Sequence, residues 1–388
     1  MVEWISKVER VLIARSDALV AAVAKDAGYS LDDARALVLA ALTFLKGLNG
    51  GRFGERSRVL LSAGSSSHRV PWGKVLIVIP NNAVAPLAVI LPVAFALAGN
   101  TVAFAGGRSS GESLGVVSQI FEGAGAPIRF EKEGARAAVD LALGLDPVDL
   151  LYVVGSSSMY PSLAQRAAER GVDLIFEGEG GGSLVVDKGS PCHLRAAVDA
   201  LISAKLRWRG QMCSAPLAVF VNSEVLNEFE RIVSDACLTS DWGEQAPVLL
   251  SAEAQAALSR VSEVLPGARR DWSQPLSRVH AIGPVGATEI FSTEIFGPVF
   301  LYESWSEVDG LKRQLSMSRF GLQLTVFSED EHLIHQLIGS ARVARVCLNM
   351  QPTNQDPLLP WGGYRRSGRS EVVSFLDKAY RSVLIESW

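Results

Sequence analysis

The stretch VLIVIP (75–80) is a continuous run of aliphatic residues that ends at a proline. Such a run is typical of a strand that is buried on both faces of a parallel sheet. The apolar run 83–98 follows, and its length predicts a buried helix even though it contains Pro86 and Pro92. It is too short to span a bilayer. TVAFAG (101–106) then predicts a second strand of the same kind.

The same alternation continues after this stretch. Helices are expected from about Glu112 and over 160–170, and strands at 127–130, 150–155 and 173–176. A second series includes strands at 183–186, 216–221, 324–328 and 345–349 and helices at about 193–208 and 223–238. The first series predicts an open parallel sheet whose ligands bind beyond the carboxyl ends of its strands, and the two series together predict an α/β protein with two parallel-sheet domains.

The two ends of the chain have a different pattern. Two amphipathic helices are expected first, the second capped by Ser30 and followed by a glycine-rich segment. RVLLSAGSSSHRV (58–70) predicts a β-hairpin around a Gly/Ser turn. The tail 380–388 is also β-prone.

Composition excludes several classes of protein. The 388 residues are 48% hydrophobic and 20% charged, with a formal net charge of −4, so a nucleic-acid surface is not expected. Four cysteines without CxxC spacing and five dispersed histidines predict no metal site. Charges at Glu3, Lys7, Glu9 and Arg10 interrupt the apolar core that a signal peptide needs, so we expect a cytoplasmic protein that does not bind membranes.

Two places in the sequence could bind a nucleotide, but neither carries a standard phosphate motif. The first long strand ends in Pro80-Asn81-Asn82 rather than in G-x-G-x-x-G, and FEGEGGGS (176–183) is not followed by GK[ST]. The second place is either a plain turn with glycines at positive φ or, because it holds Glu177 and Glu179, a mobile segment carrying a general base.

RWRGQMCSAP (207–216) contains a single cysteine, Cys213. A lone cysteine is usually a small buried apolar residue. Nearby Arg207 and Arg209 and an expected helix-to-strand junction instead favour a reactive thiolate. Both interpretations stay open on these residues alone.

The order of the short motifs along the chain distinguishes these interpretations. The set resembles the aldehyde dehydrogenase superfamily from about residue 70 to the C-terminus, and G-Q-x-C followed by EIFGPV is the most specific pair. The motifs are PNN (80–82), ALAGN (96–100), VGSS (154–157), EGGGS (179–183), GQMCSAP (210–216), EIFGPV (294–299) and PWGGYRRSG (360–368).

The resemblance implies three catalytic residues. Cys213 matches the nucleophile that attacks an aldehyde to give a thiohemiacetal and then a thioester. Asn82, 18 residues before Asn100, matches the asparagine that donates to the developing oxyanion. Glu179 matches the glutamate that activates water for hydrolysis of the thioester, because it lies 34 residues before Cys213, as in the family. Glu177 does not fit this spacing, since it lies two residues too early.

The resemblance also implies residues that bind NAD or NADP. Glu294 and Phe296 match the residues that hold the nicotinamide-side ribose. Gly155 and Ser156 match a turn near the pyrophosphate, where a helix N-terminus receives negative charge. Pro80 of the PNN motif belongs to the same cofactor site.

Three positions depart from the family pattern. Gly180 stands where the family's E-L-G-G-K motif has leucine, which should loosen the segment that carries Glu179. Ala105 replaces a lysine that contacts the adenosine ribose, and Arg108 stands where a glutamate is common. Because an arginine suits bidentate contacts with a 2′-phosphate, these changes favour NADP over NAD.

Other activities remain compatible with these residues. An acylating, coenzyme A-dependent relative or an acyl-thioester reductase would pass on the thioester instead of hydrolysing it. A catalytically inactive family member would act by binding or assembly. The chain is short for the superfamily at its N-terminus and between Cys213 and Glu294.

The resemblance further implies domains and assembly. We expect an NAD(P)-binding domain over 1–178 with a hairpin arm at about 58–73, and a catalytic domain over 179–365. The segment 366–388 should return to the cofactor domain and the arm. An isolated two-stranded arm is marginally stable, so we expect a homodimer or homotetramer.

Overall fold

The strand expected at 75–80 is β3 (Lys74–Ile79), the central strand of a five-stranded sheet with the order β5-β4-β3-β6-β7. Every pairing in this sheet is parallel. Val75 to Ile79 are all buried, as the aliphatic run predicts. The other strands are β4 (Thr101–Gly106), β5 (Ile128–Phe130), β6 (Leu150–Val154) and β7 (Asp173–Glu177).

The computed structural model describes residues 3–49, 58–62, 65–144, 147–239, 247–264, 270–285 and 293–386. The chain divides into two compact units. Unit 1 comprises Met1–Glu177, Asp356–Trp361 and Ser370–Trp388. Unit 2 comprises Gly178–Gln355 and Gly362–Arg369.

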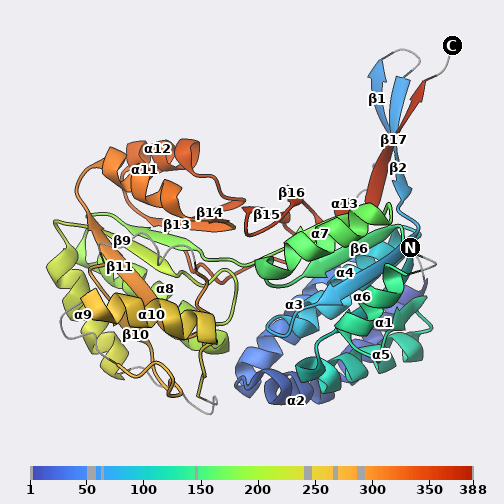
Figure 1. The fold of residues 1–388 in the computed structure, drawn as a ribbon, viewed down its shortest axis with the longest axis horizontal. Coiled ribbons are helices and arrows are strands. Elements are labelled where there is room, and N and C mark those ends of the chain that lie inside the picture. Colours follow the sequence, from blue (N-terminus) through green and yellow to red (C-terminus); the bar gives the residue numbers. More distant parts are fainter. Residues whose placement is uncertain are drawn as a thin grey trace. The chain divides into compact units, whose positions relative to one another are not determined.

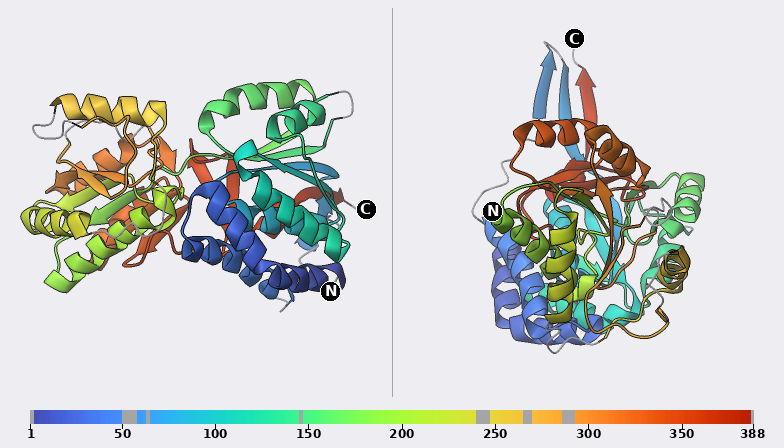
Figure 2. Two further views of the ribbon diagram at one scale, coloured as in Figure 1. Left: turned by 90° about the horizontal axis from the view of Figure 1, so that it is seen from below. Right: turned by 90° about the vertical axis from the view of Figure 1, so that its left-hand side faces the viewer.

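Helices surround the sheet of unit 1. The first three helices pack against one another, as Figure 2 shows in blue, and α3 also packs on α4. The helices are α1 (Glu3–Ala14), α2 (Ser16–Ala27), α3 (Leu31–Asn49), α4 (Val84–Leu97), α5 (Gly111–Ala124), α6 (Ala135–Ala142), α7 (Tyr160–Glu169) and α13 (Phe375–Lys378), with the short 3₁₀ helices η1 (Arg108–Ser110) and η2 (Ser157–Met159).

The expectation of two N-terminal helices was wrong, because α2 lies between the two that were identified. Its sequence, SDALVAAVAKDA, is rich in alanine and shows a weaker apolar periodicity than its neighbours. It ends at Gly28, which has a left-handed conformation (φ 69°). The cap expected for α3 is confirmed, since Ser30 Oγ accepts a hydrogen bond from Asp33 N at 3.1 Å.

Helix α4 is apolar on all sides and is buried along most of its length, as the apolar run at 83–98 predicts. Pro92 lies inside the helix. No helix in the described part of the chain is both long and apolar enough to cross a membrane.

A small antiparallel sheet with the order β1-β2-β17 forms an arm of unit 1. Its strands are β1 (Arg58–Ser62), β2 (Ser65–Pro71) and β17 (Tyr380–Glu386). β2 pairs with β17 along its whole length, from Ser65 opposite Glu386 to Pro71 opposite Tyr380. Figure 1 shows these strands side by side, although they come from opposite ends of the chain.

Unit 2 contains a six-stranded parallel sheet with the order β10-β11-β9-β8-β13-β14. Its strands are β8 (Ser183–Val186), β9 (Ala218–Asn222), β10 (His280–Ile282), β11 (Val299–Trp305), β13 (Gln323–Phe327) and β14 (Arg345–Leu348). The short β12 (Phe320–Gly321) pairs antiparallel with β15 (Trp361–Arg365), and β16 (Ser370–Val373) belongs to unit 1. The predicted α/β class, with two parallel sheets and a small β arm, is confirmed.

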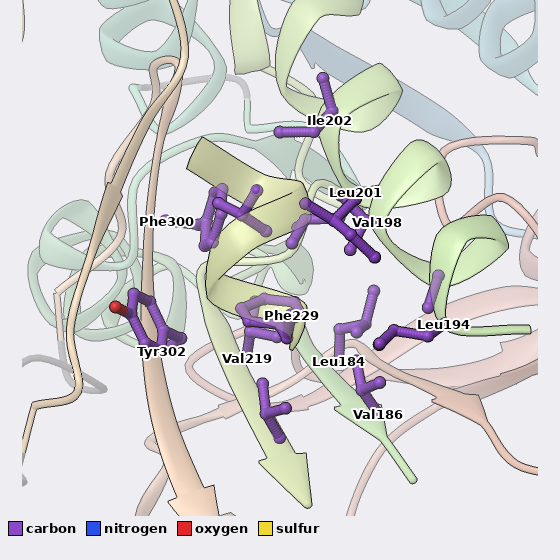
Figure 3. Packing of buried hydrophobic residues seen from close by; sticks show 14 of the residues in the cluster. Leu184, Val186, Leu194, Val198, Leu201, Ile202, Val219, Phe229, Phe300 and Tyr302 are labelled. Atoms are coloured by element: carbon purple, nitrogen blue, oxygen red, sulfur yellow. The ribbon is translucent and has the colours of Figure 1, made fainter. Parts of the chain in front are cut away.

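Helices pack on the sheet of unit 2 through an apolar cluster. Figure 3 shows side chains of α8 and α9 meeting those of β8, β9 and β11. Leu184, Val219 and Phe300 come from the strands, Val198 and Leu201 from α8, and Phe229 from α9. The helices are α8 (Pro191–Leu206), α9 (Leu226–Thr239), α10 (Ala252–Val264), α11 (Val308–Met317) and α12 (Glu331–Ser340), with the 3₁₀ helix η3 (Arg207–Gly210).

Candidate active site

Three segments that the motifs single out enter neighbouring strands of unit 2. EGGGS leads into β8, GQMCSAP into β9 and EIFGPV into β11. The spatial order of these strands is β11-β9-β8, and all pairings are parallel. The amino ends of adjacent parallel strands share one edge of a sheet, so the topology brings the three segments together.

Cys213 lies in a turn between η3 and β9, as the expected helix-to-strand junction predicts. Its thiol forms no disulfide and is partly buried. Three consecutive residues before it have left-handed backbones: Trp208 (φ 49°), Arg209 (φ 57°) and Gly210 (φ 66°). Such a conformation costs free energy in non-glycine residues, so packing must hold this turn in place.

The two arginines near Cys213 have other contacts. The Arg207 guanidinium lies over the Trp208 ring at 4.1 Å from its centre. Arg209 Nη2 donates to the carbonyl oxygen of Pro247 at 2.7 Å. These contacts hold the strained turn and give each arginine a structural role.

Gly180 packs directly on the backbone of Cys213. A Cβ atom at position 180 would overlap the carbonyl oxygen of Cys213, and it would lie 2.7 Å from the Cys213 Cα. Glycine is therefore required for this approach, in addition to any flexibility that it gives the segment. Ser367 stabilises the same segment, since its Oγ donates to Gly180 O at 3.3 Å and its carbonyl accepts from Gly178 N at 3.0 Å.

Glu294 is bound to the glycine segment. Its Oε1 accepts a hydrogen bond from Gly180 N at 2.6 Å. Burial raises the pKa of the Glu294 carboxyl to about 8, against the lowering effect of the Gly180 hydrogen bond, and the charge of Glu179 raises it further. Burial lowers the pKa of Lys205 in α8 to about 7, partly offset by attraction to Glu294.

The EIFGPV segment is also bound to the turn before Cys213. Gly297 N donates to Gly210 O at 3.2 Å. A Cβ atom at position 210 would overlap Gly297, so the two backbones approach as closely as glycine allows. Phe296 has 38% of its surface exposed, which leaves its ring available for a ligand.

The two candidate carboxylates of the glycine-rich place have different surroundings. Glu179 is partly buried, and its charge is close enough to raise the pKa of Glu294. Glu177 is buried in unit 1, where it pairs with Lys378 and accepts a hydrogen bond from Tyr152 Oη at 2.5 Å. Glu177 is thus engaged in the core of unit 1 and is not a mobile base.

The cofactor residues expected in unit 1, and the catalytic candidate Asn82, lie at one edge of its sheet. Pro80 and Asn82 follow β3, Arg108 follows β4, and Gly155 and Ser156 follow β6. These strands are neighbours in the order β4-β3-β6, so the topology places the residues at their shared carboxyl edge.

Hydrogen bonds stabilise this edge. Tyr29 Oη donates to the carbonyl oxygen of Asn82 at 3.0 Å. Ser110 Oγ, which follows β4, donates to Asn81 Oδ1 at 2.5 Å. Ser156 caps η2, since its Oγ accepts from Ser158 N at 3.4 Å. The side chain of Asn81 thus connects the loops that follow β3 and β4.

Ala105 faces the core and not the edge. It is fully buried in an apolar cluster with Leu76, Val78 and Leu163. Arg108 begins η1 and is exposed. It is therefore the cationic side chain that the loop after β4 presents at the carboxyl edge.

The structure also reveals residues that the sequence did not point to. Tyr29, Lys205 and Ser367 each contact or lie near a motif, but the sequence does not predict a role for any of them. For Ser367 a signal existed, because it belongs to PWGGYRRSG. Tyr29 and Lys205 belong to no motif, and only the tertiary contacts identify them.

Comparison with known protein families gives a match over most of the chain. The profile of the aldehyde dehydrogenase family matches residues 2–262 and 285–380, which is most of the chain. The chain belongs to the aldehyde dehydrogenase family. The resemblance inferred from the motif order is thereby confirmed.

Curated relatives of this aldehyde dehydrogenase family member are distant. D-glyceraldehyde dehydrogenase (NADP(+)) of Picrophilus torridus is 25% identical over 73% of the chain, and the match spans only 62% of that relative's length. Alpha-ketoglutaric semialdehyde dehydrogenase of Bacillus subtilis is 22% identical over 94% of the chain and 80% of its own length.

Solved structures support the fold of this family member. Succinate-semialdehyde dehydrogenase of Burkholderia pseudomallei superposes with a TM-score of 0.86 at 19% identity, covering 99% of the chain and 85% of that protein. At this identity the likeness establishes the fold alone.

Proposed function

We propose that the protein oxidises an aldehyde to a carboxylic acid with NAD or NADP, and that Cys213 is the nucleophile. The main support is the packing of Gly180 on the Cys213 backbone, which brings the segment carrying Glu179 beside the cysteine. Family membership supports the same chemistry. The names of the relatives above are consistent with aldehydes as the substrate class.

In the proposed reaction the Cys213 thiolate attacks the carbonyl carbon, and the C=O π electrons move to the oxygen. The side-chain amide of Asn82 and the backbone N–H of Cys213 are the proposed donors to this oxyanion. The carbonyl re-forms as the hydrogen leaves with its electron pair, so Cys213 becomes a thioester. A bound nicotinamide dinucleotide would supply the hydride acceptor.

Glu179 is proposed as the base for the second half of the reaction. It takes a proton from water, the oxygen attacks the thioester carbon, and the C–S bond breaks to return the Cys213 thiolate. The Glu294 and Ser367 contacts with Gly180 support this role, because they hold the residue next to Glu179.

A dinucleotide is proposed to bind at the carboxyl edge of the unit 1 sheet. Gly155 and the capping Ser156 would receive the pyrophosphate at the start of η2 and α7, and Pro80 would contact the cofactor beside them. Glu294 and Phe296 are proposed to hold the nicotinamide-side ribose. The exposed Arg108 is proposed to pair with a 2′-phosphate and so to favour NADP.

A thermal-shift titration tests the NADP preference. NADP should raise the melting temperature more than NAD at equal concentration, and Arg108→Gln should remove the difference. Equal shifts, or a larger shift with NAD, would overturn the preference.

The activity is tested by following NAD(P)H absorbance with a panel of aldehydes, with and without coenzyme A. Cys213→Ala should abolish turnover, while Cys192→Ala, which changes an exposed cysteine, should leave it intact. Turnover that survives Cys213→Ala would overturn the mechanism. Turnover strictly dependent on coenzyme A would replace hydrolysis by acyl transfer as the second step.

A further inference from the structure

A cavity of about 470 Å³ lies within unit 2; Cys213 does not line it, but Gly180, which packs on the Cys213 backbone, does. Its walls come from the glycine segment and the first residue of β8, from α11, from β12 and the start of β13, from the end of α12 and the loop that follows it, and from β15. Figure 1 shows α11 and α12 side by side in unit 2, beside β13 and β14. The volume suits a small molecule.

Three cationic side chains line this cavity: Lys312, Arg342 and Arg365. Among the described residues that line it there is no aspartate or glutamate. Three positive charges around one cavity repel one another unless an anion lies between them. The charge of the lining therefore predicts an anionic occupant.

Each cation is held differently. Lys312 Nζ donates to Gln336 Oε1 at 3.1 Å and lies 3.5 Å from Asp309, whose side chain is 82% exposed and contributes little. Arg365 has a left-handed backbone (φ 55°), and its Nη1 donates to the carbonyl oxygens of Ser316 and Ser318.

These hydrogen bonds leave N–H donors of the cationic side chains available for a ligand. Both Arg365 bonds are donated by Nη1, and a guanidinium has further N–H donors. Arg342 is exposed and forms no hydrogen bond or ion pair with any residue that the structure describes. A guanidinium with spare donors suits two oxygens of a carboxylate or phosphate.

The rest of the lining combines hydroxyl groups with an apolar floor. Ser183, Ser316, Ser318 and Ser340 contribute hydroxyls, and Phe320 and Leu322 are buried beneath them. Gly180 and Gly181 form part of the wall. The cavity thus offers charge for an anion and both polar and apolar surface for a short carbon frame.

We propose that this cavity binds a small organic or inorganic oxyanion, whose carboxylate or phosphate group is held by Lys312, Arg342 and Arg365. The site lies in unit 2, whereas the pyrophosphate of a dinucleotide is assigned to the unit 1 sheet. The proposal does not depend on the dehydrogenase activity, and it is tested without cofactor or aldehyde.

Isothermal titration calorimetry on the full chain tests the site, with inorganic phosphate and succinate as separate probes at matched ionic strength. At least one probe should bind saturably, and the stronger one identifies the preferred group. Arg342→Gln and Lys312→Gln should each weaken that binding by about tenfold or more, because each removes a charge-assisted contact. Arg342→Lys should retain more affinity than Arg342→Gln.

Two control variants locate the binding. Arg313 is exposed and follows Lys312 in the chain, but it does not line the cavity. The Arg313→Gln variant should therefore bind the probe like the unaltered protein. Arg108→Gln changes the proposed cofactor edge and should also bind normally. Circular dichroism of each variant confirms that it is folded.

Two results would overturn the proposal. One is the absence of saturable binding with both probes. The other is probe binding that neither Arg342→Gln nor Lys312→Gln weakens. Probe binding that is lost only in Arg108→Gln is one case of this result, because it would place the probe at the cofactor edge. A protein without dehydrogenase activity that still binds the probe through Arg342 would keep this site and reject only the proposed function.

Discussion

Gly180 is the residue at which the local geometry around Cys213 is most restricted. The family pattern has leucine at this position, yet here a single Cβ atom would overlap the Cys213 carbonyl. The backbone N–H and C=O of Gly180 are both engaged, by Glu294 and by Ser367. One glycine therefore connects the proposed nucleophile, the proposed ribose ligand and the PWGGYRRSG segment.

Gly180→Leu, which restores the family's residue, should destabilise the protein by about 1–3 kcal/mol, because the backbone has to shift to make room. It should also change the rate at which iodoacetamide alkylates Cys213. Urea denaturation and an alkylation time course measure the two effects.

The control for that variant is Gly339→Leu. Gly339 lies in α12 with open space around its Cα, so a leucine there should be neutral or mildly stabilising. If Gly180→Leu were as stable as Gly339→Leu, the close approach to Cys213 would be wrong.

Glu294 makes the stability of the protein depend on pH. Its carboxyl has a pKa of about 8 in the folded protein, well above the usual value near 4.5. Between these values the folded protein retains a proton that the unfolded chain has lost, so this group lowers the free energy of unfolding as pH rises. Lys205, with its pKa lowered to about 7, acts in the opposite direction from pH 7 upward.

Glu294→Gln should therefore stabilise the protein progressively relative to the unaltered chain as pH rises from about 5 to 8. The glutamine keeps an acceptor for Gly180 N but has no charge to bury. Melting temperatures of the two cofactor-free proteins across this range measure the effect. A difference that stays constant with pH would contradict the raised pKa.

At the scale of elements, a buried ion pair joins the C-terminal helix α13 to the sheet of unit 1. Lys378 pairs with Glu177 at the end of β7, and Tyr152 of β6 donates to the same carboxylate. Both charged side chains are about 95% buried. Asn100 adds a second connection, since its Nδ2 donates to Ala379 O at 2.9 Å.

Lys378→Met should destabilise the protein by about 3–5 kcal/mol, because it leaves the Glu177 charge buried without its partner. The double variant Lys378→Met with Glu177→Gln should recover much of that loss, since no charge is then left unpaired. Urea unfolding curves of both variants measure the values. If the double variant were no more stable than Lys378→Met, an unpaired charge would not be the cause.

At the scale of the whole molecule, the arm is the feature that suggests self-association. Its three strands form a separate sheet, and Leu384 and Ile385 of β17 are 57% and 45% exposed. A three-stranded sheet with exposed apolar residues and an open edge is a favourable surface for another chain. A homodimer or homotetramer therefore stays our proposal.

The double variant Leu384→Lys/Ile385→Lys should shift the protein toward monomer at micromolar concentration, because charges on the arm oppose burial against a second chain. Size-exclusion chromatography with light scattering measures the mass. Leu39→Lys, which changes an exposed leucine of α3 outside the arm, is the control and should keep the native mass. A native protein that is already monomeric would reject the proposal.

The sequence by itself determined the elements and the family. Aliphatic runs predicted β3, β4 and β8, because a strand buried on both faces must be apolar along its length. Motif order then selected Cys213 and Glu179, because short segments retain their spacing when overall identity is low. α2 was missed, since its weak periodicity does not distinguish it from a linker.

Only the tertiary structure decided which of these residues act on one another. Glu294 and Gly180 are 114 residues apart, and Lys378 and Glu177 are 201 apart. Neither pair follows from a local pattern, because the strand order and crossovers of the two sheets bring the partners together. The same is true of the Gly180 overlap with Cys213 and of the cavity with Lys312, Arg342 and Arg365. These contacts, and the pKa values that depend on burial, exist only in the folded chain, because folding buries the side chains and brings distant residues together.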